Sequence, residues 1–461
     1  MDTPNYGSIH NLLQKVFLEM KRSIKILFYL IVCSTFNDYA GAADFGPFTL
    51  RGFALGQLNW ATNQCEECQK FPDEDRQRVW ADEILPDKEY KPKSTVFSFF
   101  QPYLELRPIY LGKGFQISAL LSQRWRDGMI DLPGIWYEKN ITLRQEYYGG
   151  VTIGAFPTRG WSVADYPYGS NIGLADAWGS SGSGYGLMAN AIRYSAPILD
   201  FFRGQFHWEI THDIGDGRYE TDSSFWEAYA QYAKGALVTD WVYQLGNNGR
   251  PGSWTHGPFL GLTDDPKYDN GEMPENTQTI LLGMFRYQLT NQFEVSGGVR
   301  RNYWSGADAV MVDNDGTNNL WNNMFNVDWN APDKTDKGYG SLYNGVYKQS
   351  YPAMSYDYMA GLRFRPDTKW TFSSGVVYLS EAQTDNPMER GQSNTLTIGA
   401  AGVSYNDLYP GLTVSVGGTM VRYKHQGLAP LSMPAHSAFS GVDSRIATSG
   451  EAIGTQALYV F

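Results

Sequence analysis

The chain has 461 residues, enough for one large barrel or for two to three soluble domains. Hydrophobic residues make up 42% of it, which excludes a bundle of membrane helices. The formal net charge of −11 argues against nucleic acid as a partner, although an acidic balance is also common among soluble proteins. An aromatic content of 15%, with 31 Tyr, 14 Trp and 49 Gly, is typical of proteins that cross a membrane with strands.

The first 42 residues predict an export signal. Residues 1–19 look like an over-extended start that carries no structure. Residues 20–25 (MKRSIK) form a basic leader, and residues 26–33 form an unbroken apolar run of eight, too short to span a bilayer. Small residues at 40–42 offer a cleavage site. The sequence therefore predicts a signal peptide over 20–42 and a mature chain over 43–461.

Three cysteines are present, and Cys33 would leave with the signal. A lipoprotein signal ending at Cys33 is an alternative, but Val32 is large for the position before a modified cysteine. The mature chain keeps Cys65 and Cys68 in a CxxC motif, which predicts a loop disulfide after export. A redox-active pair or half of a zinc site are the other interpretations. We expect no metal and no cofactor, because neither a second CxxC nor a nearby His is present.

From residue 48 onward, segments of about ten residues alternate between apolar and polar side chains. The clearest is 115–126, where Ile117, Ala119 and Leu121 alternate with polar neighbours. Side chains alternate across a strand, so each segment has one face for lipid and one for water. Sixteen strands are predicted: 48–60, 96–107, 115–126, 141–147, 151–158, 185–197, 204–214, 224–233, 236–246, 277–289, 293–305, 353–365, 369–381, 394–405, 412–424 and 451–461.

The predicted connections alternate between short turns and long loops, as in membrane barrels with tight periplasmic turns and long external loops. An even number of strands places both termini on the short-turn side. Sixteen strands enclose more space than side chains fill, so the lumen should hold water. The fold class predicted is all-β: a transmembrane antiparallel β-barrel of about 16 strands.

The final strand ends on an aromatic ring. Ile453, Ala457, Tyr459 and Phe461 lie on one face of it. A terminal strand of a soluble sandwich is the alternative, but such a strand would be an unprotected edge. In a closed barrel the last strand pairs with the first and no edge remains.

With this topology and its terminal Tyr459 and Phe461, residues 43–461 resemble the Gram-negative outer-membrane porins. The resemblance implies a trimeric barrel for passive diffusion of small hydrophilic solutes, located in the outer membrane. Outer-membrane lipid and lipopolysaccharide would then be its surroundings. Tyr459 and Phe461 would form the signal that the barrel-assembly machinery reads.

The resemblance also implies that the loop after the fifth strand folds inward and narrows the channel. Residues 160–178 are unusually apolar and aromatic for an exposed loop, which indicates that they pack against something. Asp165 and Asp176 are then candidates for the acidic side of a constriction, together with Tyr166 and Tyr168. The alternative is a surface loop with two solvated aspartates.

Basic residues should line the opposite wall. Arg51, Arg124 and Arg144 have the polar parity of their predicted strands, and an arginine facing lipid near the bilayer midplane is costly. Rows of Arg and Asp facing each other would create a field across the pore that orients dipolar solutes. Each arginine could instead be a salt-bridge partner with no role in selection.

Two further functions stay open. A barrel lipid hydrolase would need a Ser–His pair near the membrane rim, and none stands out, so we do not expect an enzyme. A sugar-selective channel is the main alternative, because the long 306–352 loop contains Trp321 and Trp329 and follows Trp304. His207 and His212 are five residues apart, on opposite faces of a strand, and cannot share a metal. The Asp-rich stretches at 264–269 and 313–316 fit acidic turns better than calcium loops.

Overall fold

The computed structural model describes part of the chain as a set of antiparallel strands. The described residues are 42–61, 93–126, 129–130, 136–160, 187–213, 224–247, 277–304, 311–312, 318–319, 353–381, 383–384, 395–424 and 449–461. Within these ranges, no helix has the length and apolar character needed to cross a membrane.

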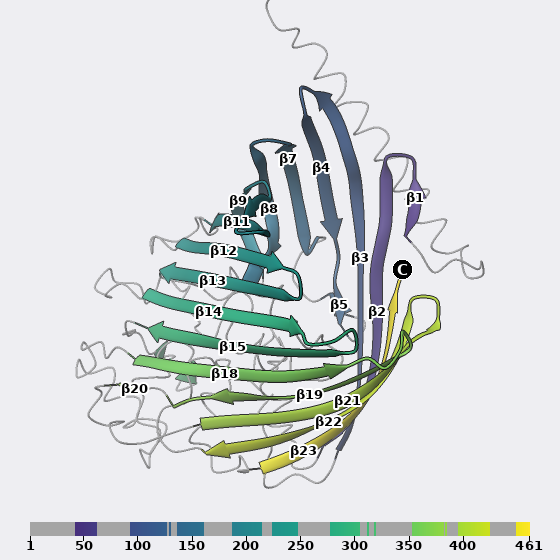
Figure 1. Ribbon diagram of the computed structural model, residues 1–461, viewed down its shortest axis with the longest axis vertical. Coiled ribbons are helices and arrows are strands. Elements are labelled where there is room, and N and C mark those ends of the chain that lie inside the picture. Colours follow the sequence, from purple (N-terminus) through teal and green to yellow (C-terminus); the bar gives the residue numbers. More distant parts are fainter. Residues whose placement is uncertain are drawn as a thin grey trace, which may run out of the picture.

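Sixteen strands form the barrel wall, as the alternation predicts (Figure 1). They are β2 (Phe48–Ala61), β3 (Lys93–Gly112), β4 (Phe115–Ser122), β7 (Glu138–Gln145), β8 (Gly149–Pro157), β9 (Leu187–Ser195), β11 (Gly204–Asp213), β12 (Ser224–Lys234), β13 (Leu237–Asn247), β14 (Thr277–Gln288), β15 (Phe293–Trp304), β18 (Ala353–Phe364), β19 (Trp370–Leu379), β21 (Thr395–Tyr409), β22 (Leu412–Lys424) and β23 (Ser449–Val460). The predicted order of strands and of short and long connections is confirmed.

Short strands extend or flank this wall. They are β1 (Ala43–Phe45), β5 (Trp125–Arg126), β6 (Met129–Ile130), β10 (Leu199–Phe201) and β20 (Gln383–Thr384). β16 (Met311–Val312) and β17 (Asn318–Asn319) form a separate two-stranded sheet.

The barrel closes between its first and last long strands. β2 pairs with β23 from Phe53 opposite Val460 to Ala61 opposite Ala452. Two backbone hydrogen bonds continue this ladder: Gly52 donates to Phe461 at 2.8 Å, and Phe461 donates to Gly52 at 3.0 Å. Figure 1 shows the C-terminus beside β2. The sandwich alternative is excluded, because the sheet has no free edge at this seam.

One predicted strand is interrupted. The expected strand 115–126 is divided into β4 and β5, although the last four residues of β4 keep the same register against β3 as β5 does. The gap lies opposite Pro102, which has no N–H to donate to the ladder. The sequence prediction missed this break because the proline is on the neighbouring strand.

Short turns carry exposed aromatic rings. Between β7 and β8 the Gln145 Oε1 atom accepts hydrogen bonds from the backbone N–H groups of Tyr147 and Tyr148, at 2.7 and 2.9 Å. Both tyrosines are exposed, as is Phe202 in the turn before β11. These rings lie at the ends of the strands, where aromatic girdles meet the headgroups of a membrane.

The two faces of the wall differ sharply. On β15, Val299 is 46% exposed, whereas the neighbouring Arg300 is fully buried. The same alternation separates exposed Leu281 from buried Leu282 on β14. Exposed apolar and aromatic residues therefore point outward, and most polar and charged side chains of the strands point inward.

Candidate functional site: the inner wall of the barrel

The inner face of β2 and β3 carries an ion pair. The Arg51 guanidinium donates to Glu105, and it lies 5.0 Å from the centre of the Tyr103 ring. The Arg51 side chain is 48% exposed and that of Glu105 is 30% exposed. Arg51 therefore lies on the same face as Glu105 and has the salt-bridge partner of the alternative interpretation, and its role in the pore stays a prediction.

Arg124 lies between β4 and β5 and is buried. It donates from Nη1 to the Tyr137 hydroxyl at 2.6 Å, and its guanidinium is 4.7 Å from the Phe99 ring centre. Its charge is thus held between aromatic rings rather than extended into open solvent.

Arg144 lies near the short-turn end of the barrel. It pairs with Gln116 and Gly150 on the neighbouring strands, one residue before β7 ends. Across β2, β3, β4 and β7 the sheet register aligns Arg51 with Tyr103, Ser122 and Glu138. Arg144 is six residues from Glu138 along β7, and so at a different height. The three predicted arginines are therefore on one wall but do not form a single row.

Glu138 is an inward carboxylate that the sequence prediction did not name. It accepts hydrogen bonds from Gln101 at 3.3 Å and from Ser122 at 3.4 Å. Its position in the alternation could have predicted this placement, because Lys139 and Ile141 are exposed on the other face of the strand.

Several predicted site residues lie outside the described part of the chain. Asp165, Tyr166, Tyr168 and Asp176 belong to residues 161–186, and Cys65 and Cys68 to residues 62–92. Their roles stay predictions. Only the base of the connection after β8, residues 158–160, is described.

That base is bound to the inner wall by Glu227 on β12. The backbone N–H groups of Arg159 and Gly160 donate to the two Glu227 carboxylate oxygens, at 2.6 and 2.9 Å. Thr158 and Gly160 are buried, which places the start of this connection against the wall. The chain therefore turns inward after the fifth barrel strand.

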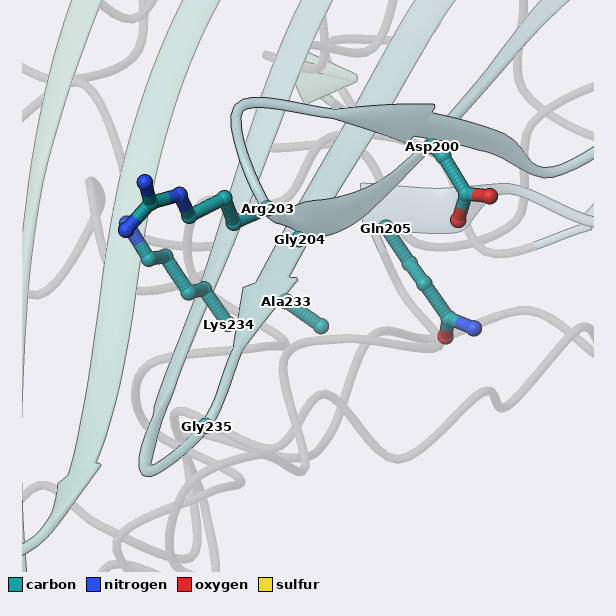
Figure 2. Close-up of a pocket in the computed structure, with 7 residues that line it drawn as sticks. All are labelled: Asp200, Arg203, Gly204, Gln205, Ala233, Lys234 and Gly235. Carbon is teal, nitrogen blue, oxygen red and sulfur yellow. The ribbon is translucent and has the colours of Figure 1, made fainter.

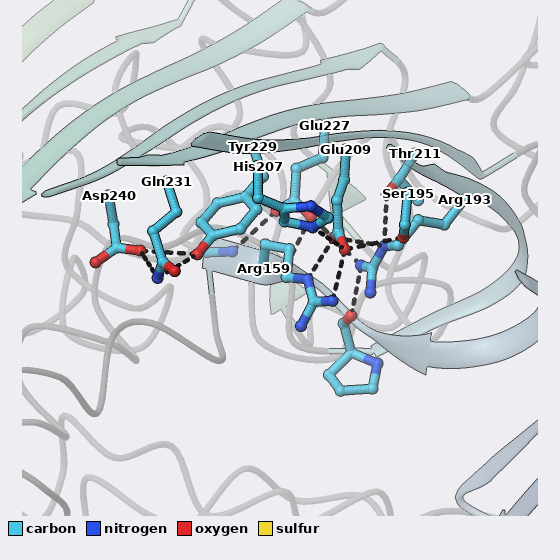
Figure 3. A network of polar contacts seen from close by, with 12 residues as sticks. Arg159, Arg193, Ser195, His207, Glu209, Thr211, Glu227, Tyr229, Gln231 and Asp240 are labelled. Atoms are coloured by element: carbon cyan, nitrogen blue, oxygen red, sulfur yellow. Dashed lines mark hydrogen bonds and ion pairs between the residues drawn. The ribbon is translucent and has the colours of Figure 1, made fainter. Parts of the chain in front are cut away.

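Two arginines and two glutamates complete the attachment (Figure 3). The Arg159 guanidinium donates to Glu209 on β11, with 2.8 Å between Nη2 and Oε1. Arg193 on β9 donates to the Pro157 carbonyl at 2.9 Å and lies 3.6 Å from each glutamate. We name Arg159, Arg193, Glu209 and Glu227 the loop-base cluster.

The loop-base cluster is balanced in charge, and its two carboxylates are shielded from solvent. The side chains of Glu209 and Glu227 are 2% and 0% exposed. The Arg193 guanidinium is 4.5 Å from the centre of the Phe156 ring, which belongs to a buried apolar cluster with Met188, Ala191 and Phe225. Because buried carboxylates are stable only when paired, the arginines must stay in place while these glutamates are ionised.

Further polar contacts join this cluster to the neighbouring strand. Gln244 on β13 donates to Glu227 at 2.8 Å. Asp240 on the same strand accepts hydrogen bonds from the Tyr229 hydroxyl at 2.7 Å and from Gln231 at 2.9 Å. The network thus spans β9 to β13 and makes this part of the wall rigid.

A second buried ion pair lies on β15 and β18. The Arg300 Nη2 and Asp357 Oδ2 atoms are 2.9 Å apart, and both side chains are fully buried. Asn302 donates to the same Asp357 oxygen at 2.6 Å. The sequence prediction missed both clusters because parity places these side chains on the inner face without showing which of them meet.

Figure 2 shows a surface hollow at the short-turn end of the barrel. Its lining comes from the turns before β11 and after β12, including Asp200, Arg203 and Lys234. These residues are at the mouth of the barrel rather than on its mid-height wall. Among the residues that the structure describes, no group of three or more His, Cys, Asp or Glu is arranged to hold a metal ion.

Comparison with known proteins gives similarity in structure only. No protein family model matches the sequence, and no curated protein matches it. An anion-selective porin from Comamonas acidovorans superimposes with a TM-score of 0.52 at 10% identity, covering 91% of this chain and all of the porin. The outer membrane channel DcaP of Acinetobacter baumannii gives a TM-score of 0.52 at 10% identity, covering 92% of this chain and 99% of DcaP.

Salmonella typhi OmpF, in a complex with daunomycin, gives a TM-score of 0.50 at 10% identity, covering 91% of this chain and all of OmpF. At such low identity these matches show the fold alone. The fold is that of the sixteen-stranded porins, as the sequence resemblance implies.

Proposed function

We propose that this protein is an outer-membrane porin, a water-filled channel for passive diffusion of small hydrophilic solutes and ions. The observation that carries the proposal is the closed sixteen-stranded wall with apolar residues outside and charged residues inside. A wall of this number of strands leaves room for an aqueous channel. The fold of the porins and channels that superimpose on it supports the same conclusion.

Liposome swelling tests this proposal. Liposomes that contain the purified protein should swell in isotonic sugars and amino acids, at rates that fall with solute size. Absence of swelling would contradict a channel. A sugar that enters faster than smaller solutes would instead favour the sugar-selective alternative, since a general pore ranks solutes by size.

The proposal includes a constriction after the fifth strand. The inward turn at residues 158–160 supports it, because the loop-base cluster directs the chain toward the lumen. Asp165 and Asp176, with Tyr166 and Tyr168, would narrow the pore, and Arg51, Arg124 and Arg144 would face them. Arg144, near the short-turn end, would act at the mouth.

Location and assembly follow from the same proposal. The signal peptide over 20–42 would direct export, and Cys65 and Cys68 would form a disulfide in the oxidising periplasm. The barrel would form a homotrimer in the outer membrane, surrounded by lipid and lipopolysaccharide. Tyr459 and Phe461 would be read by the barrel-assembly machinery. A structurally similar protein, OmpT of Vibrio cholerae, is described in a trimer form.

A further inference from the structure

The outer face of β15 carries one cation close to its external end. Arg301 is exposed and has the outward parity of Val299, the opposite of buried Arg300 and Asn302. It is eight residues beyond Phe293, which stacks on Phe364 at the short-turn end of the wall. At about 3.3 Å per residue and a tilt of about 40°, Arg301 is roughly 20 Å above that ring.

This height determines whether the Arg301 guanidinium lies in the apolar band of the membrane or near its headgroups. The apolar band of a membrane barrel is about 25 Å tall, and an outward arginine costs about 2–4 kcal/mol at its midplane but at most about 1 kcal/mol near the interfaces. Arg301 is therefore near the external headgroups, where its charge is tolerated.

Arg301 has no acidic partner in the part of the chain that the structure describes. Its contacts are a hydrogen bond from Nε to the Met354 sulfur at 3.3 Å and the Tyr303 ring, whose centre is 5.8 Å from the guanidinium. A thioether is a weak acceptor, so the guanidinium keeps most of its capacity to donate. By contrast, inward Arg300 is paired with Asp357.

Three tyrosines lie on the same outer face as this cation. Tyr356 is directly opposite Arg301 on β18, and Tyr358 is opposite Val299. Within the described residues, the hydroxyls of Tyr303, Tyr356 and Tyr358 donate no hydrogen bond, and Tyr358 is 49% exposed. The patch of Arg301, Tyr303, Tyr356 and Tyr358 thus presents one fixed charge and three hydroxyl donors toward the lipid.

We propose that this patch binds the phosphate group of an anionic lipid in the external leaflet. A guanidinium donates two parallel hydrogen bonds to phosphate, and the tyrosine hydroxyls can donate to its other oxygens. Leu281, opposite Arg301 on β14 and 50% exposed, offers an apolar contact for an acyl chain. This inference depends on the proposed placement of the barrel in the outer membrane.

Binding of bisphosphorylated lipid A to the purified full chain in detergent tests the inference, with the retained lipid measured by native mass spectrometry. Arg301→Gln should weaken binding roughly tenfold, since a charge-assisted hydrogen bond is lost. Tyr356→Phe should weaken it less. The matched control is Arg203→Gln, which removes a cation from a short turn at the other end of the barrel and should leave binding unchanged.

Equal lipid binding by Arg301→Gln and the unaltered protein would overturn the inference, as would an equal loss in Arg203→Gln. Inorganic phosphate at the same concentration should not displace lipid A; full displacement would assign the patch to free phosphate instead. Conductance in the same preparations separates this inference from the proposed function. Arg301 is outside the lumen, so Arg301→Gln should conduct normally, and a chain without conductance could still show the Arg301-dependent binding.

Discussion

At the scale of single residues, Gly52 determines how tightly the seam closes. A Cβ atom at this position would be 2.5 Å from the Gln101 carbonyl oxygen and 2.9 Å from the Phe461 ring. We expect Gly52→Ala to destabilise the barrel by about 1–3 kcal/mol, because the backbone of β3 cannot move away easily. Urea unfolding in detergent measures this change.

Gly56 provides the matched control, since a Cβ atom there would meet open space. Gly56→Ala should change the free energy of unfolding by at most about 0.5 kcal/mol. Equal stability of the two variants would show that the seam tolerates a side chain at Gly52.

A substitution of Asp165 tests the proposed constriction. We expect Asp165→Asn to shift ion selectivity toward anions, because the substitution removes a negative charge from the proposed constriction. Reversal potentials in a salt gradient measure this shift. Glu146→Gln, in the turn after β7, is the control and should leave the potential unchanged. An unchanged potential in Asp165→Asn would remove this residue from the constriction.

At the scale of elements, the loop-base cluster holds the connection after β8 on the wall. Glu227→Gln should lower the free energy of unfolding by about 3–5 kcal/mol, because buried Arg193 loses the charge that balances it. Glu105→Gln is the comparison: its pair with Arg51 is much more exposed, and its loss should cost at most about 1 kcal/mol. Similar urea midpoints for the two variants would contradict a stabilising role for the loop-base cluster.

At the scale of the whole molecule, the proposed trimer should contain three barrels that conduct independently. Single channels of the purified protein in planar bilayers should close in three equal steps, one for each barrel of the proposed trimer. Heating that separates the subunits without unfolding them should leave single steps. Closure in one step before heating would contradict a trimer of independent pores.

The amino-acid sequence by itself determined the sixteen strands, their order and the closure of the wall. Every strand of such a barrel has one face toward lipid and one toward water, so its side chains alternate with a period of two. Because this alternation is a local property, the sequence shows it without the tertiary structure. Arg51 and Arg144 could be assigned to the inner face for the same reason. The alternation does not predict the interruption between β4 and β5, opposite Pro102.

Only the tertiary structure decided which inward charges meet. Arg159, Arg193, Glu209 and Glu227 come from four separate segments of the chain, and the register of β9, β11 and β12 brings them together. Parity places a side chain inside the barrel but gives neither its height nor its neighbours. For that reason the sequence predicts an inward Arg124 but not the packing of its guanidinium between the Phe99 and Tyr137 rings.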